Sequence, residues 1–241
     1  MKKLILLLII GLMSCNSTYK KLHHSFHFIK QDKEQFEISA YEVTNAQYRT
    51  FAKETQISDF LPDTTMWNDL NDGIGIIHGK NYYWHQAFDD YPVVNITPFQ
   101  AKAYCDWLTQ KSKRQGNKSY VEYRLPTSDE LISIITSHNI IEKRDYINQY
   151  SCDFTGNFKY KIGQTDTFDY NNDKYLLCGN ITAYKQGDYY NLIGNVAEIC
   201  SDGYVIGGGW NDIPSQSLQK RPFTNASPDI GFRIVAEQKQ Q

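Results

Sequence analysis

The sequence has 241 residues, and 25 Lys and Arg residues against 27 Asp and Glu give it a formal net charge of −2. A chain of this length can form one substantial domain. It has no long basic block and no stripe of interleaved arginine and aromatic residues, which argues against nucleic acid as a partner. Aromatic residues make up 14% of the chain, which favours a loop-rich domain with many half-buried rings over a helical bundle.

The first residues have the pattern of a secretory signal. Two lysines follow Met1, and the apolar run over residues 4–13 is too short to span a bilayer. The run ends in Leu-Met-Ser-Cys, which resembles the lipobox of bacterial lipoproteins, where the cysteine is acylated and becomes the new N-terminus. The sequence therefore predicts a signal peptide over residues 1–14 and a lipid on Cys15; ordinary signal cleavage nearby is the alternative.

A lipidated cysteine predicts that the mature chain is held on a membrane surface in the cell envelope, at the outer membrane or facing the periplasm. No later stretch approaches the roughly 20 apolar residues that a membrane helix needs. Residues 15–33 are polar and mixed, and we interpret them as a tether leading to one domain over residues 34–237. Three histidines in this tether, His23, His24 and His27, could bind a metal, but a solvated linker is the favoured interpretation.

Four further cysteines, Cys105, Cys152, Cys178 and Cys200, follow Cys15. In an extracytoplasmic compartment disulfides can persist, and four cysteines allow three pairings between which the sequence does not choose. Their spacing does not fit the usual structural zinc motifs.

Three helix starts are predicted by capping boxes, in which a threonine hydroxyl and a Gln or Glu side chain each cover a free backbone amide. The threonines are Thr44, Thr97 and Thr127. In the second helix Pro98 occupies the first position, and Gly116 is expected to end it. Apolar residues recur at helical spacing in the second and third helices: Ala101, Tyr104, Trp107 and Leu108, then Leu131, Ile134 and Ile135.

After Tyr150 the sequence changes to short extended pieces broken by glycine and asparagine. The stretch Tyr204 to Ile206 has the pattern of a strand and precedes three successive glycines. Short helices in the first half and irregular, extended pieces in the second predict an α+β domain with much coil, not an alternating βαβ fold.

Six separated blocks resemble, in order, the formylglycine-generating enzyme (sulfatase-modifying factor) domain. Among them are strings similar to the RLPTEAE, GNVWEW, GGSW and GFR motifs of that family. The blocks are Phe36–Ile38 with Tyr41–Tyr48, Pro92–Ile96 with Ala101–Leu108, Tyr123–Glu130, Gly194–Glu198, Gly207–Trp210 and Gly231–Val235. The resemblance implies an irregular, loop-rich α+β fold related to C-type lectins.

The resemblance also implies a copper site, which this sequence lacks. Active members of the family hold copper(I) with two cysteines just after the GGSW string, because this soft ion needs thiolate ligands. The matching positions here are Asp212 and Ser217, and no cysteine lies beyond Cys200. We therefore expect no copper and no family-type oxidase activity.

Calcium, which prefers oxygen ligands, is also implied by the resemblance. The family has two structural calcium sites. Matching motif positions assigns the first to Asn191, Gly194, Val196 and Glu198, and the second to Asn157, Phe158, Asp173 and Tyr175. Alternatively, Asn191 and Glu198 only satisfy backbone amides in a tight turn.

The long loop between Trp210 and Gly231 lies over the substrate groove in this fold family, as the resemblance implies. The expected groove residues are Trp210, Asp212, Ser217 and Arg221, and Asn225 and Asp229 lie on the same loop. The leading hypothesis is a non-catalytic lipoprotein that binds or scaffolds an envelope protein; tethered relatives of this kind occur in the gliding and secretion machinery of Bacteroidetes. The alternatives are a periplasmic enzyme with altered, non-copper chemistry and a lectin-like receptor for a glycan or peptide.

Overall fold

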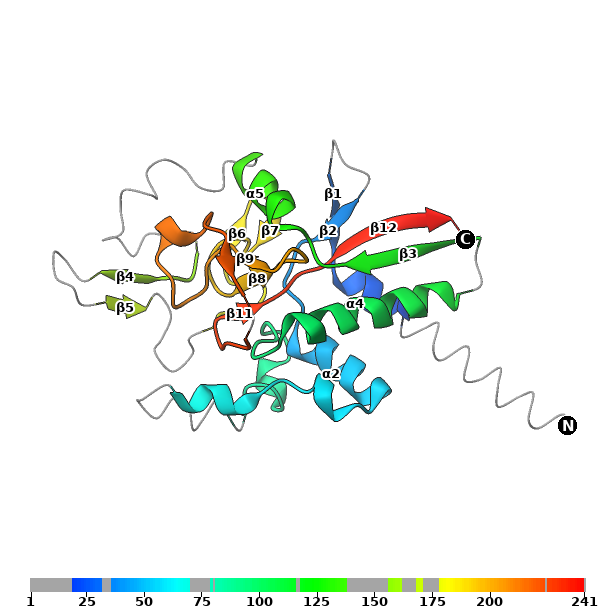
Figure 1. Ribbon diagram of the computed structural model, residues 1–241, viewed down its shortest axis with the longest axis horizontal. Helices are drawn as coiled ribbons and strands as arrows, with labels where there is room; N and C mark the ends of the chain where they lie inside the picture. Colours follow the sequence, from blue (N-terminus) through cyan, green and yellow to red (C-terminus); the bar gives the residue numbers. More distant parts are fainter. Residues whose placement is uncertain are drawn as a thin grey trace, which may run out of the picture.

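The computed structural model describes residues 19–31, 36–69, 79, 81–115, 118–137, 156–161, 168–170, 178–223 and 225–240. These residues form short helices and two four-stranded sheets, with much coil between them (Figure 1). The expected α+β class is therefore confirmed. Among the described residues no helix is long and apolar enough to cross a membrane.

The first sheet joins three distant parts of the chain. Its strand order is β1 (Phe28–Lys30), β2 (Glu37–Ser39), β12 (Val235–Gln240) and β3 (Ser119–Arg124), and all neighbours are antiparallel. Helix α4 lies along β3 (Figure 1). The hydroxyl of Thr109 in α4 accepts a 2.8 Å hydrogen bond from the backbone N–H of Tyr123 in β3, which fixes the helix against the strand.

The second sheet lies next to the glycine triplet, because residues 207–209 directly follow its strand β9. Its order is β10 (Arg221–Pro222), β9 (Tyr204–Ile206), β8 (Ala197–Ile199) and β11 (Ile230–Gly231). The pair β11 and β8 is parallel, so the end of the long loop returns beside β8. Two hairpins complete the described strands: β4 (Lys159–Lys161) with β5 (Phe168–Tyr170), and β6 (Lys185–Gln186) with β7 (Tyr189–Tyr190).

The three predicted helices begin where their capping boxes predict. They are α2 (Asn45–Thr55), α4 (Pro98–Lys113) and α5 (Ser128–Ser137), and short 3₁₀ helices lie at Ser58–Phe60, Thr64–Asp69, Gln86–Phe88 and Pro214–Gln216. In α2 the Thr44 hydroxyl accepts from the Gln47 amide at 3.2 Å, while Gln47 accepts from the Thr44 amide at 2.9 Å. The expected end of α4 at Gly116 lies outside the described residues.

The expected tether is wrong for much of residues 15–33. Residues 19–25 form a helix, and Tyr19, Leu22 and Phe26 are buried in the largest core cluster. The Tyr19 and Tyr123 hydroxyls are 2.9 Å apart. The three buried residues recur at i, i+3 and i+7, a helical period that the surrounding polar residues obscure.

The described cysteines are buried thiols. Cys105, Cys178 and Cys200 are each free, so none of these three forms a disulfide with another. Cys152 lies outside the described residues. No group of three or more His, Cys, Asp or Glu side chains arranged for a metal is found in the described part of the chain, which includes the three histidines near the N-terminus.

Candidate functional site

The glycine triplet turns the chain sharply after β9. Gly207 and Gly208 have φ of +95° and +69°, in the left-handed region where only glycine is free of strain. A Cβ on Gly209 would lie 2.4 Å from the carbonyl oxygen of Asp229. Glycine at this position therefore allows the segment before β11 to lie directly against the turn.

Asp212 and Arg221 form the polar centre of this turn. The Arg221 guanidinium donates to both carboxylate oxygens of Asp212, at 3.0 and 3.2 Å. Asp212 also accepts from the Gly209 backbone N–H at 2.8 Å. The two charged residues line a small hollow of about 30 Å³ together with residues of β8 and β9.

Three of the four expected groove residues, Trp210, Asp212 and Ser217, are buried, and Arg221 is exposed. Ser217 is fully buried, and its hydroxyl donates to the Pro214 carbonyl at 2.7 Å. Trp210 is buried in a cluster with Trp67 and Cys178, and its indole N–H donates to the Pro228 carbonyl at 3.0 Å. The left-handed glycines direct the chain inward, so motif position alone does not place these side chains at the surface.

Asp229 is a buried carboxyl group beside the same turn. Burial raises its pKa, and the neighbouring Asp212 carboxylate adds to the effect, while Ser227 and Arg221 oppose it. The Ser227 hydroxyl donates to Asp229. The sequence placed Asp229 on this loop but gave it no role, because it belongs to no motif.

A second polar cluster lies deep in the core. Arg233, fully buried, donates to Glu198 at 2.7 Å. Its other N–H groups donate to four backbone carbonyls, those of Ser39, Ala40, Tyr190 and Asn191, at 3.1 to 3.2 Å. This buried cation therefore connects β2, β7 and β8.

Glu42 completes this cluster, and sequence analysis missed it. Its two carboxylate oxygens accept from the side-chain amides of Asn191 and Asn195 at 2.8 and 2.9 Å. Complete burial and the nearby Glu198 carboxylate raise the pKa of Glu42 to about 8, against the lowering effects of Arg233 and the two asparagines. The one signal in the sequence that could have indicated Glu42 was its position as an acidic residue between Tyr41 and Val43, just before the capping box of α2.

Residues 12–238 match the Sulfatase-modifying factor enzyme 1-like domain. The chain belongs to this family. Two solved structures share the fold: CarF, with TM-score 0.52, 16% identity and coverage of 84% of this chain and 86% of that chain, and PvdO from Pseudomonas aeruginosa, with TM-score 0.52, 17% identity and coverage of 84% and 80%. No curated protein sequence matches the chain.

The residues expected to form the first calcium site can be placed in the fold. Asn191, Gly194, Val196 and Glu198 are all buried. Arg233 binds one oxygen of Glu198, and the other, Oε2, is buried without a hydrogen-bond partner. An orphaned carboxylate oxygen among oxygen donors fits a hard cation such as calcium.

The second quartet is described only in part. Asn157 and Phe158 are buried, and the Asn157 amide donates to the Asn195 side chain at 3.2 Å. Asp173 and Tyr175 lie outside the described residues. This site therefore stays a prediction from motif position.

Proposed function

We propose that the protein is a lipid-anchored, non-catalytic module of a bacterial cell envelope that binds or scaffolds an envelope protein. The observation that carries this proposal is the Asp212–Arg221 ion pair in place of a thiolate pair. At the two positions that match the family's copper ligands, Asp212 binds Arg221, and Ser217 donates to the Pro214 carbonyl of the 3₁₀ helix that precedes it. Carboxylate and hydroxyl oxygens are poor ligands for copper(I).

The described thiols do not substitute for the missing ligands. Cys105 lies on α4, Cys200 directly after β8, and Cys178 in the cluster around Trp210. Burial raises the pKa of all three, which favours the neutral thiol over the thiolate that binds a soft metal. A retained fold with replaced copper ligands supports binding as the role of this domain.

The surface around Asp212 and Arg221 is the proposed partner site. Arg221 is about half exposed, with 43% of its side chain accessible, and an arginine that already holds a carboxylate can present its remaining donors to a protein partner. The nearby hollow is only about 30 Å³, which suits a protein contact better than an enclosed small substrate.

The test is a crosslinked pull-down of the tagged, lipidated protein from native membranes, followed by mass spectrometry. We expect a reproducible envelope partner that is lost in a D212A/R221A variant. The matched control is K102A/D106A, which removes another ion pair, on α4, and should keep the partner. No specific partner, or equal loss in both variants, contradicts the proposed site and directs attention to the enzyme and glycan-receptor alternatives.

The anchor is proposed on Cys15. Mass spectrometry of the mature protein should find an acylated Cys15 as the first residue, because the short apolar run ends directly before it. Cys15→Ser should move the protein from the membrane fraction to the soluble fraction. An unmodified N-terminus at another residue contradicts the anchor without affecting the partner site.

Calcium is proposed at Asn191, Gly194, Val196 and Glu198 as a structural ion. Its support is the oxygen-only donor set and the orphaned Oε2 of Glu198. The ion would hold the chain between β7 and β8.

A further inference from the structure

A larger cavity lies apart from the Asp212 site. It has a volume of about 530 Å³ and is formed by the first turns of α4, the end of β3 and the turn after β8. The volume is within the range of ordinary small-molecule sites. Its walls include Phe99, Lys102, Glu122, Arg124, Leu125 and Ser201.

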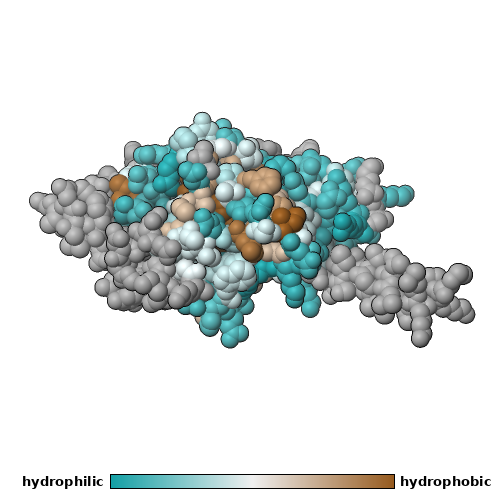
Figure 2. All heavy atoms as spheres, turned by 60° about the horizontal axis from the view of Figure 1, so that its bottom comes forward, coloured by the Kyte–Doolittle hydropathy of each residue, from teal (hydrophilic) through white to brown (hydrophobic). Residues whose placement is uncertain are grey.

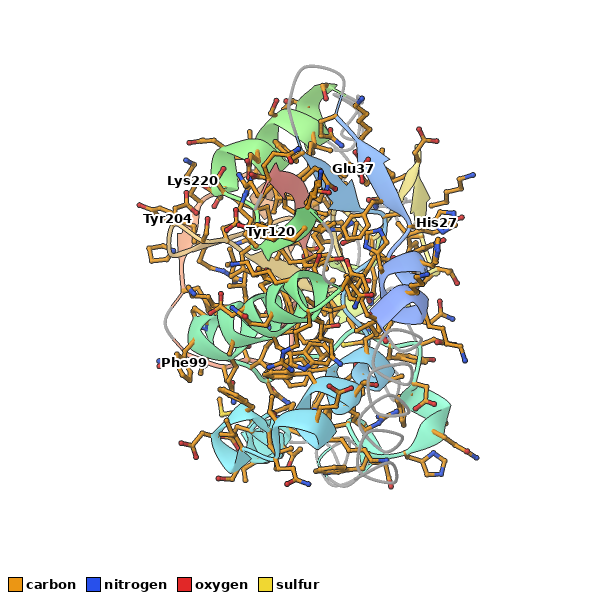
Figure 3. The ribbon with its side chains drawn as sticks, turned by 90° about the vertical axis from the view of Figure 1, so that its right-hand side faces the viewer. His27, Glu37, Phe99, Tyr120, Tyr204 and Lys220 are labelled. Atoms are coloured by element: carbon orange, nitrogen blue, oxygen red, sulfur yellow. The ribbon has the colours of Figure 1, made fainter. Side chains whose placement is uncertain are left out.

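Phe99 marks the mouth of this cavity. It is 67% exposed, more than any other large apolar side chain in the described part of the chain. Its side chain projects on the same side of the molecule as Tyr204 and Lys220 (Figure 3). Figure 2, which brings the lower side of Figure 1 forward, shows apolar side chains gathered near the centre of that face with hydrophilic ones around them. An exposed ring at the rim of a cavity is available to cover an apolar ligand.

The positive charges in the cavity walls are already matched within the chain. Lys102 pairs with Asp106 at 2.7 Å. Arg124 pairs with Glu130 at 2.7 Å and with Glu237 at 2.6 Å. A bound anion would therefore compete with carboxylates that already neutralise these side chains.

The remaining acidic wall residue is also matched. Glu122 lies 3.5 Å from Lys239, so a bound cation would compete with an existing partner. The two wall thiols, Cys105 and Cys200, are buried, and burial raises the pKa of each above its ordinary value. The walls thus offer apolar contacts, chiefly from the exposed Phe99, and each charged wall residue has an ion partner.

We propose that this cavity binds an uncharged, apolar small molecule with an aromatic or branched aliphatic body. Burying a charged group here would remove its hydration without supplying a free counter-charge. An uncharged ring system loses little hydration and gains the apolar contact of the exposed Phe99 ring. This site is separate from the Asp212 surface, so either proposal can fail alone.

The test compares two fluorescent probes that share a ring system, neutral N-phenyl-1-naphthylamine and its anionic relative 1-anilinonaphthalene-8-sulfonate. We expect one site for the neutral probe and an affinity at least ~tenfold higher than that for the sulfonate, a difference of about 1.4 kcal/mol. Ser201→Trp should fill the cavity and weaken neutral-probe binding by ~tenfold or more. Ser133→Trp, on an exposed position of α5, is the matched control and should bind as the parent chain does.

Phe99→Ala provides a second variant if Ser201→Trp does not fold. Because Phe99 is mostly exposed, its removal should leave the melting temperature nearly unchanged and weaken the neutral probe several-fold. Equal affinity for both probes would overturn the proposed preference of the cavity for an uncharged ligand. Unchanged binding of the neutral probe in both cavity variants would overturn a small-molecule site. So would a result in which no probe binds and both variants lose an envelope partner.

Discussion

Arg233 is a fully buried cation whose donors are satisfied inside the chain. One carboxylate and four backbone carbonyls accept its hydrogen bonds, so its large desolvation cost is offset by a complete set of partners. The arrangement is specific to a planar guanidinium, because the compact ammonium of lysine cannot reach carbonyls on both sides at once.

Replacing Arg233 by Met should destabilise the protein strongly. Glu198 would stay buried with no counter-charge, and breaking a buried pair costs about 3–5 kcal/mol. Urea unfolding at pH 7 measures the loss. Lys102→Met is the control, since its exposed pair with Asp106 should contribute only about 0–1 kcal/mol. Similar losses of unfolding free energy in the two variants would show that the buried pair of Arg233 contributes no more than an exposed pair.

The pH dependence of stability should depend on Glu42. Its pKa is about 8 in the folded chain, against an ordinary value of 4.5, so between these values the folded state binds a proton that the unfolded state has released. Stability from this group is present below about pH 4.5 and is lost as pH rises through about 8. The melting temperature should therefore fall from pH 5 to 8.

Glu42→Gln is the variant that tests this assignment. Glutamine keeps the size of the side chain but has no titrating proton, so the profile between pH 5 and 8 should become flatter. Asp188→Asn, at an exposed position, should leave the slope unchanged. The assignment to Glu42 fails if its variant keeps the parent slope.

At the scale of elements, helix starts were predictable and the N-terminal helix was not. A capping box is a local device, because Thr44 and Gln47 satisfy each other's amides within four residues. Residues 19–25 have no such device, and this helix is held by distant partners such as Tyr123. Short strands such as β10 and β11 likewise depend on pairing with distant residues.

A chain shortened to begin at residue 34 should be much less stable than one that begins at residue 17. It lacks β1 and three buried side chains, Tyr19, Leu22 and Phe26, each of which stabilises by about 1.5–3 kcal/mol. Thermal unfolding of both chains measures the difference. Equal melting temperatures would restore the interpretation of residues 15–33 as a tether.

At the scale of the whole molecule, the family fold places two polar centres in different environments. Arg221 is exposed and within reach of a partner, and Asp212 is largely buried beside it, whereas Glu42, Glu198 and Arg233 are enclosed. The first centre suits recognition. The second holds the N-terminal, central and C-terminal segments together.

Calcium should raise the melting temperature of protein that has first been treated with a chelator. An ion that binds the folded state alone stabilises by mass action, by about 2.7 kcal/mol at 100 times its Kd. Magnesium is the control, because its strict octahedral demand suits a carbonyl-rich site poorly. Identical melting temperatures with calcium, magnesium and chelator would exclude a structural calcium ion at these residues.

The sequence by itself determined the family, the α+β class and the starts of three helices, because these depend on ordered motifs and on contacts within one turn of chain. It also placed Asp212 and Arg221 on the loop between Trp210 and Gly231. Only the tertiary structure decided that Trp210 and Ser217 are buried, that Glu42 joins Glu198 in the core, and that α4 and β3 enclose a neutral cavity. These features depend on which distant segments meet, since burial and pKa are set by neighbours that sequence spacing does not specify.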